Sequence, residues 1–129
     1  MSSENDPSPT FRLRLTERAH RSLDEATIHF AETASPEVAV AWREGFYAIL
    51  SPLSDAPRRF PRASEPFHRE VRQVIYRRPS SRVAYRGLFT ITGEEESSPD
   101  APTVVILLVR HGAARPLTRA EVRAVESDE

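Results

Sequence analysis

Arginine and histidine are the residues of this sequence that could bind anions or transfer protons, and half of the arginines lie in one stretch. Between Ala56 and Thr90 there are nine arginines and two glutamates, a local charge of +7, although the whole chain has a net charge of −1. Positive charge concentrated in this way predicts a phosphate-rich or acidic partner. A solvated, charged loop and strand surface would give the same pattern.

All eighteen basic residues are arginine. An arginine stays protonated at working pH, so it stabilises an anion but cannot accept a proton. Cleavage of RNA by attack of a 2′-hydroxyl also needs a general base and a general acid. The side chains that could supply them are His68, His111, Glu70 and the tyrosines. A histidine at the end of a strand, such as His111, is also often a partly buried side chain bonded to a backbone carbonyl.

Composition excludes several classes of site. The chain has no cysteine, which excludes disulfides, thiolate zinc sites and a cysteine nucleophile. The four histidines lack metal-ligand spacing, so we expect neither a metal nor a cofactor. The longest apolar run, Val104 to Val109, is too short to cross a bilayer, and the polar N-terminus lacks the features of a signal peptide. We therefore expect a cytoplasmic protein that binds no membrane.

Apolar periodicity predicts two helices after a first strand. Phe11, Leu13 and Leu15 alternate with arginines, which indicates a strand with one buried face at 11–15. A helix is expected at 17–33, capped by Thr16. A second begins at Ser35-Pro36-Glu37 and ends near Pro52. Their apolar stripes predict an antiparallel hairpin, in which Trp42 and Phe46 belong to the core.

The second half of the chain predicts three strands at 70–76, 82–91 and 103–109, joined as an antiparallel meander. The middle strand should bury Val83, Tyr85, Phe89 and Ile91. We expect an α+β fold in which the helical hairpin covers one face of the sheet, with the arginines gathered on the opposite face or rim. Because neighbouring residues of a strand point to opposite faces, Arg72 should point away from Val71, towards the face that carries the arginines. We expect the acidic loop at 92–102 to be a solvated hairpin tip; the alternative is that it folds over the arginines.

The domain organisation follows: residues 1–9 as a disordered lead, 10–117 as one domain and 118–129 as a tail, in which a capping box at Thr118–Glu121 allows a short helix.

The predicted order of elements, a strand, two helices and three strands, resembles that of the RelE/ParE superfamily of toxins from type II toxin–antitoxin systems. The resemblance covers roughly residues 10–117, and the segments that carry it are Phe11–Ala19, Ala41–Leu53, Ala56–Arg62, Val71–Tyr76, Arg82–Arg86 and Val105–Gly112. It is closer to the ParE branch, in which the last strand commonly ends in His-Gly followed by arginines. Here His111-Gly112 is followed by Ala113-Ala114-Arg115.

The resemblance implies a growth-inhibiting toxin, of the plasmid-stabilization type, that a cognate antitoxin protein neutralises. ParE-like members poison DNA gyrase without cutting anything, whereas RelE-like members cut mRNA on the ribosome. RelE chemistry relies on lysines and on a tyrosine near the C-terminus, and this chain has no lysine and no tyrosine after Tyr85. The first hypothesis is therefore a ParE-like toxin. The alternatives are an mRNA endonuclease and a degenerate member that only binds antitoxin.

The candidate site residues follow from these hypotheses. For the endonuclease, the catalytic candidate is His111, as base or acid. For contact with target or antitoxin, the candidates are seven arginines: Arg58, Arg59, Arg62, Arg72, Arg86, Arg110 and Arg115.

Overall fold

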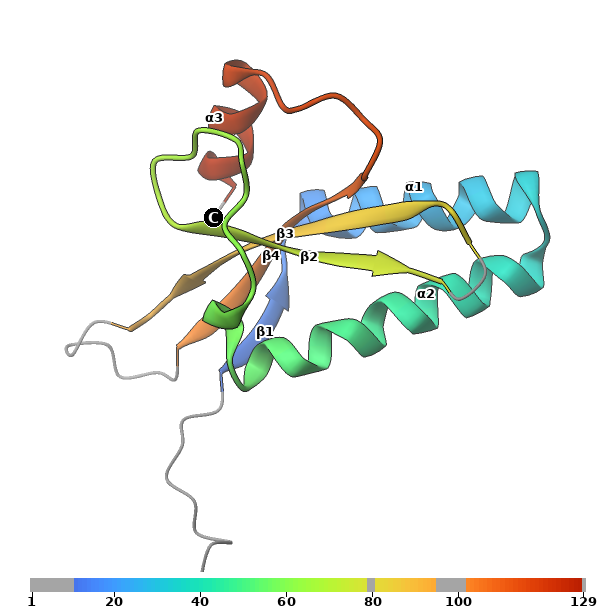
Figure 1. Ribbon diagram of the computed structural model, residues 1–129, viewed down its shortest axis with the longest axis horizontal. Coiled ribbons are helices and arrows are strands. Elements are labelled where there is room, and N and C mark those ends of the chain that lie inside the picture. Colours follow the sequence, from blue (N-terminus) through green and yellow to red (C-terminus); the bar gives the residue numbers. More distant parts are fainter. Residues whose placement is uncertain (1–10, 79–80, 95–101, 129) are drawn as a thin grey trace, which may run out of the picture.

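The computed structural model describes residues 11–78, 81–94 and 102–128. The expected disordered lead at 1–9 and most of the acidic loop lie outside these residues. The described part forms one four-stranded sheet with helices on both faces (Figure 1). The α+β class and the strand–helix–helix–strand–strand–strand order are confirmed. No described helix is long and apolar enough to cross a membrane.

The two long helices begin where the sequence predicts. The first, α1, spans Glu17–Thr33, and the hydroxyl of Thr16 caps it by accepting the N–H of Ala19 at 3.0 Å. The second, α2, spans Pro36–Leu50, and the hydroxyl of Ser35 accepts the N–H of Val38. Proline at the first helical position suits α2 because that N–H needs no intrahelical partner. Two short 3₁₀ turns follow, η2 at Ser51–Ser54 and η3 at Pro57–Arg59.

The sheet has the order β1-β4-β3-β2. The strands β2 (Val71–Arg77), β3 (Ala84–Thr92) and β4 (Thr103–His111) form the expected antiparallel meander. The first strand, β1 (Arg12–Leu15), pairs in parallel with β4 at one edge. This placement makes β4 an inner strand, as its apolar sequence predicts.

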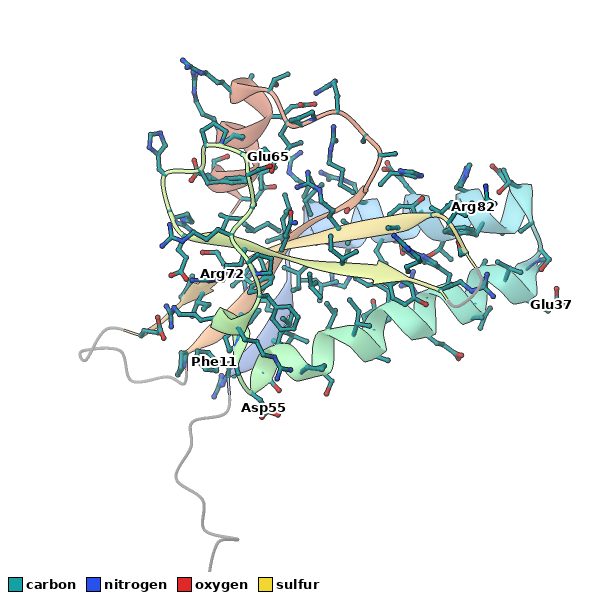
Figure 2. The ribbon with its side chains drawn as sticks, in the orientation of Figure 1. Phe11, Glu37, Asp55, Glu65, Arg72 and Arg82 are labelled. Carbon is teal, nitrogen blue, oxygen red and sulfur yellow. The ribbon has the colours of Figure 1, made fainter. Side chains whose placement is uncertain are left out.

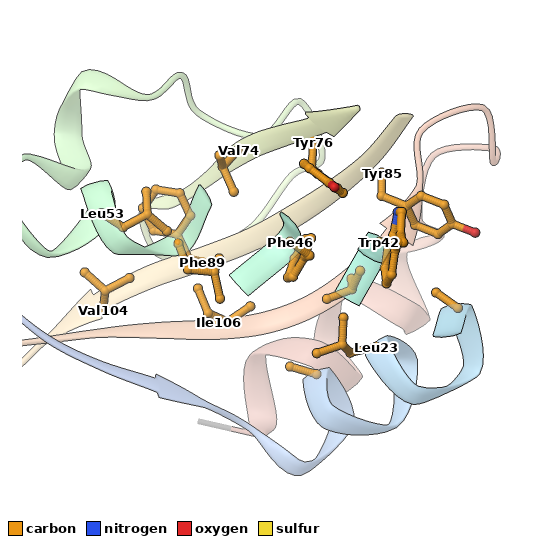
Figure 3. Close-up of a cluster of buried hydrophobic side chains, with 14 residues drawn as sticks. Leu23, Trp42, Phe46, Leu53, Val74, Tyr76, Tyr85, Phe89, Val104 and Ile106 are labelled. Carbon is orange, nitrogen blue, oxygen red and sulfur yellow. The ribbon is translucent and has the colours of Figure 1, made fainter. Parts of the chain in front are cut away.

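Two apolar cores lie on the two faces of the sheet. The larger core lies between the sheet and the helices α1 and α2, and Trp42 is its aromatic centre (Figure 3). The ring centroid of Trp42 is 5.6 Å from that of Phe46, on which it stacks, and 5.0 Å from that of Tyr85. The smaller lies under α3, which spans Arg119–Ser127 and begins with the capping box of Thr118 and Glu121. The apolar face of α3 covers a sheet face that we expected to carry arginines.

Two strand predictions need correction. Leu13 was expected in the core but is 38% exposed. Because β1 is a short edge strand, only Phe11, just before β1, and Leu15, its last residue, pack against the core. Val83 was expected on the core face of the middle strand. It is also exposed, because the ladder between β2 and β3 ends at the pair of Arg77 and Ala84.

Candidate functional site

The arginines of the predicted recognition surface are held by partners within the chain. Arg58 lies between two carboxylates: its Nη2 donates to Glu94 Oε1 at 2.6 Å, and its Nε donates to Glu70 Oε2 at 3.2 Å. These hydrogen bonds raise the pKa of Arg58 above its usual value, that with Glu94 most. The bond from Arg58 likewise lowers the pKa of Glu94. These bonds join the end of β3 to the 3₁₀ turn η3, and Glu94, the first acid of the acidic loop, contacts Arg58 directly.

Arg72 shares Glu70 with Arg58. Its Nε donates to Glu70 Oε2 at 2.6 Å, and its Nη1 donates to the carbonyl of Phe60 at 2.6 Å. Arg72 does point opposite Val71, but the expected face is wrong. Val71 packs in the core under α3, and Arg72 pairs with Phe89 on the face that α1 and α2 cover. The predicted alternation of Arg72 and Val71 is correct, but the face of the sheet on which each lies depends on where α3 packs.

Arg86 and Glu65 form a buried ion pair on the α3 side of the sheet. The pair joins Arg86 Nη2 to Glu65 Oε2 at 2.6 Å, and the two side chains are 12% and 1% exposed. Arg86 Nη1 also donates to Glu65 Oε1 and to Gln73 Oε1. The bond from Arg86 lowers the pKa of Glu65 although burial opposes the shift. Glu65 Oε2 accepts the N–H of Leu117 as well, so the pair joins the loop before β2, β3 and the segment before α3.

Arg110 and Arg115 lie at the end of β4 and in the turn beyond it. Arg110 Nη2 donates to the carbonyl of Arg115 at 2.6 Å, and Arg115 Nη1 donates to Glu121 Oε1 at 2.8 Å. The bond from Arg115 lowers the pKa of Glu121 to about 2. Both arginines therefore fix the path of the chain into α3.

The two remaining candidates, Arg59 and Arg62, are exposed. The guanidinium of Arg59 lies 5.3 Å from the ring centroid of Phe60. The side chain of Arg62 has no partner among the described residues, although its backbone forms a β-bridge with Arg72. Of the seven predicted arginines, these two have no described carboxylate or carbonyl partner for their guanidinium groups.

A β-bulge in β4 determines the face on which His111 lies. Leu88 pairs with Leu108 but Phe89 pairs with Ile106, which leaves Leu107 as the extra residue. A bulge reverses the alternation of the residues beyond it. Val109 consequently faces α1 and α2, and its N–H donates to the hydroxyl of Ser22 on α1 at 3.0 Å.

His111 therefore lies on the helix side of the sheet. It pairs with Tyr85, and the two ring centroids are 5.1 Å apart. Arg86 pairs with Arg110 on the opposite face. His111 thus does not join Arg86 in one site, contrary to our expectation that it could make the arginine surface catalytic. Of the predicted arginines, Arg110 alone lines the same groove as His111. Its Nδ1 accepts the N–H of Ala113 at 3.0 Å, which leaves Nε2 for an external partner.

His111 does line an open groove of about 360 Å³ between α1 and the end of β4. Glu25 and His29 of α1 lie along the same groove, opposite Tyr85. Tyr85 is 6% exposed, and its hydroxyl points away from the apolar cluster (Figure 3) and has no partner among the described residues. Burial raises the pKa of Tyr85, so its hydroxyl stays protonated at neutral pH.

Sequence reasoning missed the residues that organise these contacts. Glu65 was counted only as an acid in a basic stretch and Glu70 only as a possible base or acid, yet each binds arginines that were predicted as site residues. His29 was not among the candidates. It is exposed and lines the groove with His111. Its spacing of four from Glu25 places both on one helix face. Within the described residues, no group of three or more histidines and carboxylates could hold a metal ion.

The fold has a counterpart among solved structures. A chain of the structure titled "Chromosomal ParDE TA system from P. aeruginosa" matches with a TM-score of 0.60 at 20% sequence identity, and the match covers 79% of this chain and 96% of that one. No protein-family model and no curated protein matches the sequence. The structural similarity confirms the RelE/ParE-type fold that the sequence resembles.

Proposed function

We propose that this chain is the toxin of a toxin–antitoxin pair, a ParE-like protein that binds and inhibits a macromolecular target such as DNA gyrase. A cognate antitoxin neutralises it. The fold shared with a chain of the P. aeruginosa ParDE system supports this proposal. The proposal extends the similarity from fold to function, which fold alone does not fix.

The observation that favours binding over RNA cleavage is the separation of His111 from Arg86 by the sheet. Phosphodiester cleavage needs a base and a cation that reach the same phosphate, within hydrogen-bond distance of the reacting atoms. Arg86 is also buried against Glu65. Arg86 therefore serves the fold, and the exposed surface is left for recognition.

The groove on the helix side supports a second candidate, an mRNA endonuclease. His29 and His111 line it together with the buried hydroxyl of Tyr85, so two imidazoles could act as base and acid without a metal. In this hypothesis the catalytic groups lie between α1 and β4, where Arg110 also lines the groove, and not beside Arg86.

Toxicity is the first test. We expect inducible expression of the chain to stop growth, and co-expression of its cognate antitoxin to restore it. Unimpaired growth at confirmed expression of folded protein would refute both active-toxin hypotheses and leave the third, a degenerate member that only binds antitoxin.

The target is tested with the purified chain in two assays, supercoiling by gyrase and cleavage of translated mRNA. We expect inhibited supercoiling and intact mRNA. His111→Ala and His29→Ala should leave the inhibition unchanged, as should the control His20→Ala, another exposed histidine of α1. Cleaved mRNA, lost in His111→Ala and His29→Ala but kept in His20→Ala, would establish the endonuclease instead.

A further inference from the structure

The described acids around α3 form ion pairs or hydrogen bonds, whereas the two arginines of α3 have no described partner. Four described acids of α3, its C-cap and the loop before β2 form ion pairs: Glu65–Arg86, Glu70–Arg72, Glu121–Arg115 and Asp128–Arg18. The carboxylate of Glu126 accepts the backbone N–H groups of His68 and Arg69, at 2.6 and 3.1 Å. Arg119 and Arg123 are exposed and have no partner among the described residues. Positive charge therefore remains uncompensated on this side.

These two arginines line a pocket. Arg119 and Arg123 are four residues apart, which places them one above the other on the same face of α3. With His68, Pro66 and Val122 they surround an open volume of about 250 Å³ between α3 and the loop before β2, which lie side by side (Figure 1). The lining has two guanidinium groups and an imidazole and, among the described residues, no carboxylate.

We propose that this α3 pocket binds the phosphodiester backbone of a nucleic acid. Arginine forms paired hydrogen bonds with phosphate oxygens, and two arginines one turn apart on an open surface can contact neighbouring phosphates. Sequence-tolerant base recognition uses aromatic side chains as stacking platforms, and the lining has no phenylalanine, tyrosine or tryptophan. The contact therefore involves the backbone and not the bases, and its affinity depends strongly on salt. This inference does not depend on the proposed toxin function.

The test is fluorescence anisotropy of a labelled single-stranded RNA with the full chain, titrated at several salt concentrations. Each phosphate contact to a single strand contributes about 0.7 to the slope of log affinity against log salt. The double variant Arg119→Gln/Arg123→Gln should therefore reduce that slope by about 1.4. At 0.15 M salt it should weaken binding about fifteenfold, or roughly fourfold for each arginine.

Arg82→Gln is the matched control. Arg82 is also exposed and without a described partner, and it lies at the far end of the sheet from α3 (Figure 2). We expect it to bind RNA with nearly the wild-type affinity and salt slope. An equal loss in Arg82→Gln would show attraction to net charge alone and would overturn the α3 pocket, as would a double variant that is folded by circular dichroism and binds like the wild type.

Two further measurements identify the ligand. Duplex DNA is titrated in the same way, and binding that weakens in the double variant supports a backbone contact. Inorganic phosphate is then titrated alone. A chain that binds phosphate in this pocket but neither RNA nor DNA would overturn the nucleic-acid assignment in favour of a small phosphate-bearing ligand.

Discussion

Removal of the Glu65 carboxylate leaves the guanidinium of Arg86 buried without its counter-charge. Glu65 accepts hydrogen bonds from Arg86 at 3.1 and 2.6 Å and from the N–H of Leu117 at 3.3 Å. Loss of one partner of a buried ion pair costs about 3–5 kcal/mol. Because Gln73 Oε1 still accepts from Arg86 at 3.0 Å, we expect Glu65→Ala to lower the free energy of unfolding by about 3 kcal/mol, at the lower end of that range.

The assay is urea unfolding followed by circular dichroism, with an exposed ion pair as the control. Asp24 pairs with Arg43 at 2.9 Å, but the two side chains are 58% and 35% exposed. Asp24→Ala should therefore cost less than about 1 kcal/mol. Glu65→Leu combined with Arg86→Met should recover most of the loss, because no buried charge remains. Equal losses in Glu65→Ala and Asp24→Ala would refute the reasoning.

The same pair predicts a pH dependence. The bond from Arg86 holds the pKa of Glu65 below its ordinary value of 4.5, although burial opposes the shift. A carboxylate with a lowered pKa stabilises the fold fully above the pKa of the unfolded state and loses this contribution as the pH falls through the folded-state pKa. The stability difference between wild type and Glu65→Ala should therefore be constant near neutral pH and shrink on acidification below about 4.5. A difference that grows in acid would contradict the assignment.

Three further substitutions test the core by urea unfolding. Trp42 is 2% exposed at the aromatic centre, so Trp42→Ala should cost about 3–5 kcal/mol; a loss below 1 kcal/mol would contradict close packing there. Gly→Ala within a helix normally stabilises by about 1 kcal/mol, but the new methyl of Gly45→Ala would overlap the Tyr76 hydroxyl. We expect a loss of about 1–3 kcal/mol, and a gain would disprove the contact. Tyr85→Phe should change stability by less than about 0.5 kcal/mol, since the hydroxyl has no partner among the described residues; a larger loss would mean that it is bonded in the fold.

Local sequence signals predicted the elements well, because the forces that set them act within a few residues. Thr16 and Ser35 accept the N–H groups of Ala19 and Val38, so the starts of α1 and α2 could be read from cap and spacing alone. The apolar run of β4 likewise predicts an inner strand. Leu13 shows the limit of this reasoning, because alternation predicts a buried face but does not tell how far the helices reach over an edge strand.

The sequence by itself determined the chemistry available to this protein: arginines that cannot take up a proton, few histidines and no cysteine. The tertiary structure decided what each group faces. The bulge at Leu107 adds one residue to β4 and turns His111 towards α1, away from Arg86. The packing of α3 buries a face that periodicity left open. Some of the carboxylates that engage the arginines come from distant positions, as in the pair of Arg58 and Glu94. Such contacts depend on the path of the whole chain, which local pattern does not encode.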